Sequence, residues 1–247
     1  MSEFQVLYES SDALGPLIVL DSKTTRTLSF GDSDEQSKLL KLQPHIPQHT
    51  YLQAMLLVLL FQQPKRVMVL GLGGGGLIHA LKHFDAGIKM TAVELRPQVI
   101  ELAKRYFQLP MSKKLTIEQA DAAEFLAAKQ HKKVDIIFAD IYSAEGVDDK
   151  QLSAAFIADA SAMLKAEGVL VLNCWKEHSQ DRALLARLQQ HFAQVSACLT
   201  GGGNWVIFAT KRDQQMTISG LKNKAQQLSQ QLDFPLARLL TRFDVWS

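Results

Sequence analysis

A run of glycines between an apolar stretch and a helical pattern constrains the fold of this chain most. Residues 67–70 are apolar and lead directly into Gly71, and glycines occupy positions 73–76. A helix-like apolar pattern resumes at Leu77. A strand that ends in glycines and continues as a helix exposes backbone N–H groups to a ligand at the helix N-terminus. The run therefore predicts a ligand-binding loop, and a tight turn without a ligand is the alternative.

Two acids follow later strand-like runs at corresponding places. Glu94 ends the run of residues 89–94, and Asp121 follows the run of residues 115–118. An acid at the end of the second strand can accept hydrogen bonds from both ribose hydroxyls of a nucleotide. Asp121 suits an adenine amine, with the N–H of Ala122 donating to the ring. It equally suits the N-cap of the helix that begins there, and one carboxylate oxygen can serve each role.

Strand-like and helix-like runs alternate through the middle of the chain. Such alternation predicts a parallel sheet covered by helices on both faces. Two closing runs, joined by glycines 201–203, predict an antiparallel hairpin at one edge. The expected fold is α/β, with a doubly wound, mostly parallel, seven-stranded Rossmann-like sheet. Its strands are expected at residues 66–70, 89–94, 115–118, 134–139, 168–173, 194–199 and 204–210.

Three regions are expected along the chain. Residues 1–46 hold a small antiparallel β appendage and, from residue 32, a polar linker. Residues 47–212 form a nucleoside-binding catalytic domain that opens with a helix over residues 47–62, and residues 213–247 form a helical tail.

Composition argues against several kinds of partner. The net charge is only +2, so no basic field for nucleic acid is expected. The longest apolar run, residues 55–61, is too short to span a membrane, and the N-terminus does not read as a secretory signal. Cys174 and Cys198 lie in apolar runs, as free thiols of a reducing cytoplasm do. We expect a cytoplasmic protein with neither a nucleic-acid nor a membrane partner.

One histidine pair has the spacing of metal ligands. His79 and His83 are four residues apart, which places both on one face of a helix. A third ligand is lacking nearby in the sequence, and a solvated helix face explains the pair. No metal is therefore expected.

Several stretches carry a resemblance to a known family. They are FQVLYES…PLIVLDSKTTRTLSFG, QHTYLQAM, PKRVMVLGLGGGG, AVELRPQVIELAKRYF, DAAEFL, VDIIFADIY and MLKAEGVLVLN, between residues 4 and 210. In these stretches the chain resembles the spermidine synthase (aminopropyltransferase) family, on the fold of the AdoMet-dependent methyltransferases. The resemblance implies a homodimer, a sulfonium nucleoside co-substrate (AdoMet or decarboxylated AdoMet) and a small amine as acceptor.

The resemblance also assigns roles to residues. Asp140 stands where the family has its catalytic acid. The loop glycine Gly75 is assigned to the co-substrate together with the residues that the resemblance implies for the nucleoside, which are Gly71, Gly73, Glu94, Asp121 and Ala122.

Transfer to an amine needs a base, because an amine is an ammonium at neutral pH. Asp140 ends an apolar run and is the candidate base, with Tyr142 as a hydrogen-bonding partner or as a ring beside the cationic carbon. Gln48, Tyr51 and Ser143 are expected in the substrate pocket. A strand-end cap is the alternative for Asp140, and a core position is the alternative for Tyr51.

Two positions depart from the family pattern. The glycine loop of the family carries an acid where this chain has Gly74, and its substrate loop carries a second acid where this chain has Ser143. Each charged hydrogen bond lost to an ammonium group weakens binding by roughly 1.5–3 kcal/mol. Glu145, Asp148 and Asp149 are candidates to replace these acids, and solvated surface charge is the alternative.

Three functions compete on these grounds. The first is transfer of an aminopropyl or related group to a small amine, as in polyamine metabolism. The second is methyl transfer from intact AdoMet, which Gly74 favours because an acid there would repel the carboxylate of AdoMet. The third is a noncatalytic nucleoside-binding protein that has kept the pocket and lost the substrate acids.

Overall fold

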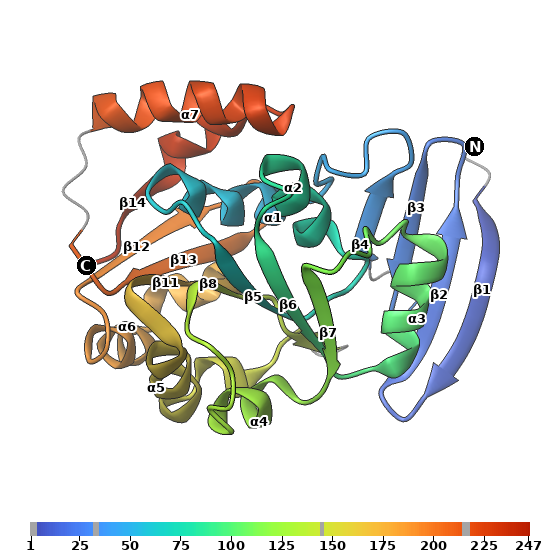
Figure 1. The fold of residues 1–247 in the computed structure, drawn as a ribbon, viewed down its shortest axis with the longest axis horizontal. Coiled ribbons are helices and arrows are strands. Elements are labelled where there is room, and N and C mark those ends of the chain that lie inside the picture. The colour runs from blue at the N-terminus through green and yellow to red at the C-terminus, as the bar shows by residue number, and fades with distance from the viewer. Residues whose placement is uncertain (1–3, 32–34, 144–145, 214–217) are drawn as a thin grey trace.

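An eight-stranded sheet runs through the middle of the protein (Figure 1). The computed structural model describes residues 4–31, 35–143, 146–213 and 218–247. In order across the sheet the strands are β14 (Phe243–Val245), β12 (Gln194–Leu199), β13 (Asn204–Thr210), β11 (Leu164–Trp175), β8 (Val134–Ala139), β5 (Arg66–Leu70), β6 (Lys89–Glu94) and β7 (Leu115–Gln119). Pairing is parallel from β11 to β7, whereas β13, β12 and β14 complete the other edge in antiparallel pairs.

This architecture confirms the expected α/β fold and adds one strand to it. The closing hairpin of β12 and β13 lies where the sequence predicts it. The extra strand, β14, comes from the C-terminal tail, where only helix was expected, and it pairs with β12. Three residues are too few to show the alternation by which a strand is recognised in sequence.

Alternate residues of the central strands face two separate layers of core, because side chains alternate across a strand. In β5, Val67 and Val69 belong to one cluster, and Met68 and Leu70 belong to the other. The first layer holds α1 (Thr50–Met55), the 3₁₀ helix η1 (Leu56–Leu60), α2 (Gly76–Phe84), α7 (Ile218–Leu232) and η4 (Leu236–Arg242). The second layer holds α4 (Ala122–Ala127), α5 (Ala154–Met163) and α6 (Arg182–Gln189). Coverage on both faces explains why every residue of β8 is buried.

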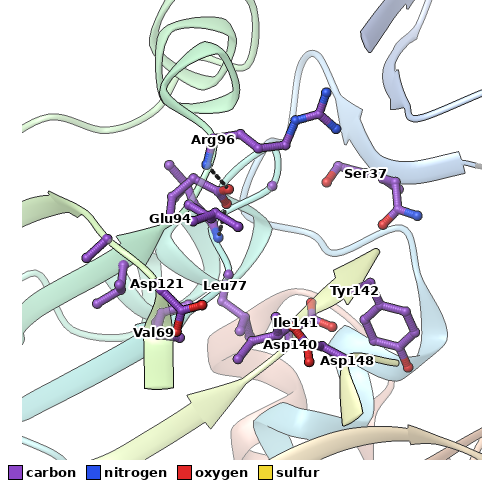
Figure 2. Close-up of a pocket in the computed structure, with 18 of the residues that line it drawn as sticks. Ser37, Val69, Leu77, Glu94, Arg96, Asp121, Asp140, Ile141, Tyr142 and Asp148 are labelled. Carbon is purple, nitrogen blue, oxygen red and sulfur yellow. Dashed lines mark hydrogen bonds between the residues drawn. The ribbon is translucent and has the colours of Figure 1, made fainter. Parts of the chain in front are cut away.

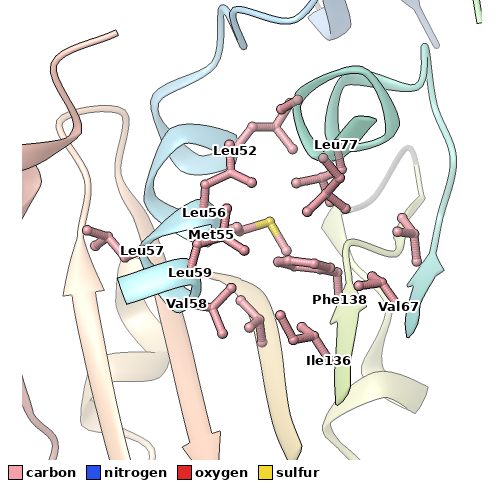
Figure 3. Packing of buried hydrophobic residues seen from close by; sticks show 14 of the residues in the cluster. Leu52, Met55, Leu56, Leu57, Val58, Leu59, Val67, Leu77, Ile136 and Phe138 are labelled. Carbon is pink, nitrogen blue, oxygen red and sulfur yellow. The ribbon is translucent and has the colours of Figure 1, made fainter. Parts of the chain in front are cut away.

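The helix expected over residues 47–62 is shorter and changes type. α1 ends at Met55, and η1 continues the segment to Leu60. Every residue of η1 is buried, so tertiary packing rather than an amphipathic pattern decides its geometry. Met55 lies over Phe138 of β8 within the first layer (Figure 3).

A four-stranded antiparallel sheet forms the N-terminal appendage. Its strands are β1 (Gln5–Asp12), β2 (Gly15–Asp21), β3 (Thr25–Ser29) and β4 (Glu35–Leu40). The first three were expected, but β4 occupies the segment predicted as linker, because its polar sequence hides a strand that pairs with β3. The sheet packs on α3 (Pro97–Tyr106) through a small core that includes Leu28, Leu39 and Leu102.

Short elements complete the described part of the chain. β9 (Tyr142–Ser143) pairs with β10 (Gly146–Val147), and two further 3₁₀ helices are η2 (Asp149–Leu152) and η3 (Lys176–Gln180). Among the described residues, no helix combines the length and apolar character that crossing a membrane requires. The division of the chain into three regions, at residues 46 and 212, stays a prediction.

Trp246→Ala is expected to lower the free energy of unfolding by about 3–5 kcal/mol, the usual cost of deleting a buried large aromatic side chain. Trp246 is only 7% exposed and meets Trp205 edge to face, with ring centroids 5.8 Å apart. Urea unfolding followed by circular dichroism measures the change. The neighbouring Val245 is 54% exposed, so Val245→Ala is the control and should change stability little. Equal stability of both variants and the wild type would contradict a structural role for Trp246, which follows β14 directly.

Candidate active site

A cavity of about 350 Å³ opens at the carboxyl ends of the parallel strands (Figure 2). Ligands in open α/β sheets bind at this edge. The strand ends contribute Gly71 after β5, Glu94 at the end of β6, Asp121 after β7 and Asp140 after β8. Ser37 of β4 brings the N-terminal sheet into the lining. The structure thus brings together the acids and the loop that the sequence predicts at one site.

Gly71 allows two strand ends to meet. Its φ is +90°, and a Cβ added there would lie 2.2 Å from the carbonyl oxygen of Asp140. The N–H of Asp140 donates to the carbonyl of Leu70, and the N–H of Gly71 donates to the carbonyl of Val93. A side chain at position 71 would therefore push β8 away from β5.

The rest of the glycine loop is packed against the N-terminal half of the chain. The N–H of Gly74 donates to Oγ of Ser37 over 2.9 Å, and a Cβ at Gly74 would lie 2.8 Å from the ring of Phe107. The position where the family has an acid is thus closed by neighbouring side chains. Gly73 lines the cavity, whereas Gly75 does not and is instead the N-cap residue of α2, in a left-handed conformation with φ of +79°.

Glu94 is held in place by backbone donors. Its two carboxylate oxygens accept hydrogen bonds from the N–H groups of Leu72 and Arg96, at 2.9 and 3.0 Å. Figure 2 shows the carboxylate between these two segments at the cavity wall. Each oxygen keeps a further acceptor site. The arrangement suits a pair of adjacent hydroxyl donors.

Asp121 is the N-cap of α4, so that interpretation is confirmed. Oδ1 accepts from the N–H groups of Ala123 and Glu124, and Oδ2 lies 2.9 Å from Nζ of Lys150. Burial acts to raise the pKa of Asp121, but the bonds from Lys150 and the two N–H groups outweigh it and hold the pKa below its ordinary value. Ala122 lines the cavity beside it. No pattern in the sequence indicates a role for Lys150.

Asp140 ends a buried chain of amides. Nδ2 of Asn204 donates to Oδ1 of Asn173 over 3.1 Å, and Nδ2 of Asn173 donates to Oδ1 of Asp140 over 2.8 Å. Burial raises the pKa of Asp140 to about 6, although hydrogen bonds from Asn173 and Tyr51 act to lower it. The carboxyl group is therefore poised to exchange a proton close to neutral pH.

Sequence reasoning missed both asparagines that are hydrogen-bonded in series to Asp140. Asn173 lies within the apolar strand β11, Asn204 begins β13, and both are buried. A polar residue in an apolar run was the available signal, but only the pairing of β11 with β13 shows that the two amides meet.

Tyr142 stands beside Asp140 with its hydroxyl buried. The hydroxyl makes no hydrogen bond of good geometry with the described residues, and its ring meets Trp175 edge to face at 5.5 Å. Burial, and then the charge of Asp140, raise the pKa of Tyr142 far above its ordinary value. The hydroxyl therefore stays protonated and can act as a donor but not as a base.

A second cavity, of about 210 Å³, adjoins the first. Gln36, Tyr51 and Tyr142 line both cavities, so these side chains form the wall between them. Glu35 lines the second cavity, and its Oε1 lies 3.9 Å from Nε2 of His49. Burial lowers the pKa of His49. A cationic ligand in this cavity would thus meet an acid and a neutral ring.

The other predicted residues differ in where they lie. Gln48 lines neither cavity, and its amide donates to the carbonyl of Ile46. Ser143 belongs to β9, and Glu145 lies outside the described residues. Asp148 lines the first cavity and caps η2, whereas Asp149 is exposed.

The histidine pair does not form a shared site. Nε2 of the buried His79 lies 2.8 Å from the carbonyl oxygen of Phe107. His83 turns instead toward Asp233, which follows α7.

Comparison with known proteins agrees with this geometry. A model of the spermine/spermidine synthase domain matches residues 45–219. A polyamine aminopropyltransferase of Neisseria meningitidis is 28% identical over 221 residues, covering 87% of this chain and 84% of that protein. A spermidine synthase solved with the transition state analogue AdoDATO superposes with a TM-score of 0.74 at 16% identity, over 97% of this chain and 86% of that one. Human methyltransferase-like protein 13, solved with SAH, superposes with a TM-score of 0.67 at 22% identity, over 75% of this chain and 93% of that one.

The fold is that of the methyltransferase-like α/β proteins, and the matched domain defines a class of transferases. The chain belongs to the spermine/spermidine synthase family, as a divergent member.

Asp140→Asn is expected to stabilise the protein at pH 8 and to change its stability little at pH 4. The pKa of Asp140 is higher in the folded than in the unfolded chain, so stability falls as pH rises from 4 through 6. Asparagine carries no charge and removes that loss, which is at most about 3 kcal/mol for a shift of this size. Urea unfolding at both pH values measures the difference.

Asp135→Asn is the matched control with the opposite sign. Burial acts to raise the pKa of Asp135, but hydrogen bonds from Lys165 and the N–H groups of Lys65 and Arg66 outweigh it and lower the pKa. Its ionised form therefore stabilises the fold above its unfolded pKa, and the substitution should destabilise the protein at pH 8. A loss of stability at pH 8 in Asp140→Asn as well would overturn the prediction for that residue.

Proposed function

We propose that this protein transfers an aminopropyl or related group from decarboxylated AdoMet, or from AdoMet itself, to a small amine. The observation that carries the proposal is Asp140, a carboxylate of raised pKa that lines the first cavity and is hydrogen-bonded by Tyr51, a residue of the wall between the two cavities. The first cavity has the features of a nucleoside site, and the second offers an acid to a cation. A base between donor and acceptor is what amine alkylation requires.

The nucleoside is assigned to the first cavity. Glu94 is proposed to accept both ribose hydroxyls with the acceptor sites that its two backbone bonds leave. The N–H of Ala122 is proposed to donate to the adenine ring. Asp121 keeps Oδ1 on the N-cap, so the adenine amine would share Oδ2 with Lys150 or displace it.

The reaction is an in-line displacement. The amine nitrogen forms a bond to the carbon next to the sulfonium sulfur, and the carbon–sulfur bond breaks with its electron pair going to sulfur. The nucleoside leaves as a neutral thioether. The amine loses one proton, which Asp140 accepts, and the chain from Asn204 through Asn173 orients that carboxylate. Tyr142, protonated throughout, is proposed to orient the amine by accepting a hydrogen bond from an amine N–H on its phenol oxygen.

The acceptor is assigned to the second cavity. Ser143 lacks the acid that the family uses on an ammonium group, and Glu35 is proposed as the replacement because it lines this cavity. Asp148 lines the first cavity and is the weaker candidate. Since Glu35 lies at a different place from position 143, we expect ordinary transfer to putrescine to be slow. By the family resemblance, we expect a cytoplasmic homodimer.

Glu94→Ala is expected to weaken nucleoside binding by about tenfold to a hundredfold, because two charged hydrogen bonds to the ribose are lost. Calorimetry with AdoMet, decarboxylated AdoMet and methylthioadenosine measures it. Glu101→Ala, at an exposed position of α3, is the control and should bind normally. Unchanged affinity in Glu94→Ala, with the fold intact by circular dichroism, would remove Glu94 from the site.

The same titrations distinguish a second candidate function. Position 74 is a glycine closed in by its neighbours, so no acid there would repel the carboxylate of intact AdoMet. This favours a methyltransferase. Tighter binding of AdoMet than of decarboxylated AdoMet would support methyl transfer. The reverse order would support aminopropyl transfer.

Asp140→Asn is expected to lower turnover by about 10²–10⁴-fold and to leave nucleoside affinity unchanged. In the wild type the rate should rise with pH through about 6, as the carboxyl group ionises, and the variant should lack this rise. Turnover is measured with decarboxylated AdoMet and a panel of small amines, and affinity is measured by calorimetry. Asp148→Asn, at the same cavity, should keep the pH profile. Full activity of Asp140→Asn would exclude this base, and a wild type inactive with every amine would favour the noncatalytic alternative.

A further inference from the structure

Three polar side chains that line neither cavity meet on another part of the surface. They are His45 from the segment between β4 and α1, His83 from the last turn of α2, and Asp233 directly after α7. In Figure 1 helix α7 lies along the side of the protein where α2 is found. The cluster therefore joins three segments that are far apart in the sequence.

The three side chains present their polar atoms to one another. Nε2 of His45 lies 3.0 Å from Oδ2 of Asp233, and Nε2 of His83 lies 3.3 Å from the same oxygen. One nitrogen from each imidazole and one carboxylate oxygen all lie within 4.8 Å of one another. In a tetrahedral zinc site with bonds of about 2.0–2.2 Å, neighbouring ligand atoms are about 3.4 Å apart. The separations to Asp233 are close to that value.

We propose that His45, His83 and Asp233 bind a first-row divalent cation of the Zn²⁺ type. Two imidazole nitrogens and one carboxylate oxygen are ligands that zinc takes, with a water molecule in the fourth position. Calcium and magnesium are excluded as preferred occupants, because they favour sites made of oxygen atoms. The proposal departs from the expectation that the chain has no metal.

A hydrogen-bonded cluster without a metal is the alternative. The two imidazole rings are stacked, with centroids 3.8 Å apart and planes 20° apart, so their lone pairs run nearly parallel. A shared cation requires the rings to turn toward each other. His83 and Asp233 are 37% and 49% exposed in their side chains, which gives both of them room to turn, whereas His45, at 18%, has less room.

A cation at this site would link the C-terminal segment to the rest of the protein. A cation bound only by the folded protein stabilises it by mass action. The three ligands belong to the segment before α1, to α2 and to the end of α7, so the cation would hold α7 against the domain. None of the three lines either described cavity, so binding should not depend on the proposed transferase activity.

The test is calorimetric titration of the full-length, tag-free protein with Zn²⁺. We expect one equivalent to bind and the melting temperature to rise with Zn²⁺ concentration. His83→Gln and Asp233→Asn should each lower affinity by about tenfold or more, because removal of a ligand costs at least as much as removal of a group that only hydrogen-bonds to one. His191→Gln, at an exposed histidine beyond α6, is the matched control and should bind as the wild type does.

Melting without metal shows whether each variant is folded, so a lost site is distinguished from a lost fold. Saturable binding that His83→Gln and Asp233→Asn weaken and His191→Gln does not would support the site. Absence of saturable binding to the wild type would overturn the proposal. Equal affinity in the wild type and in a folded His83→Gln variant would overturn it as well.

Discussion

The contact between Gly71 and the backbone of Asp140 is the constraint on which the site depends. A Cβ at position 71 would fall 2.2 Å from the carbonyl oxygen of Asp140, so the close approach of these strand ends requires glycine. The same residue donates to Val93, just before Glu94. One residue without a side chain therefore fixes the ends of β5, β6 and β8 relative to one another. Glu94 and Asp140 inherit their separation from that packing.

The polar interior behind Asp140 shows how a buried carboxylate is kept in one orientation. Burial disfavours its charge, and the amide of Asn173 partly compensates. Asn173 is itself oriented by Asn204 on the neighbouring strand β13 and is fully buried. A network with its members satisfied in this way specifies one arrangement of the side chains. The antiparallel hairpin, which in the sequence looks like a simple extension of the sheet, thus helps to orient Asp140 in the parallel half.

The local sequence pattern was sufficient to predict features that lie within one strand–turn–helix unit. The glycine loop, Glu94, Asp121 and the order of the parallel strands were all predictable in this way. Features made by pairing across the chain were not. The polar strand β4 is recognisable only through its partner β3, and β14 is too short to show a period.

The same limit applies inside the candidate site. Gln48 was placed in the pocket by its nearness in sequence to Tyr51, yet its amide bonds to Ile46, outside both cavities. Glu35 and Asn204 line the second cavity from segments distant in sequence. No spacing rule relates such positions, because the sheet and not the local chain brings them together.

The closed position at Gly74 has a consequence for how this chain can diverge. An acid introduced there alone would collide with Phe107, whose side chain is fully buried. Removing Phe107 alone would leave a void in the core between α3 and the N-terminal sheet, at a cost of about 3–5 kcal/mol. The two positions are therefore epistatic: each change is harmful without the other. In a lineage that has both Gly74 and Phe107, packing therefore opposes the change to a loop with an acid at position 74. It does so even where selection for a co-substrate with an ammonium group would favour that acid.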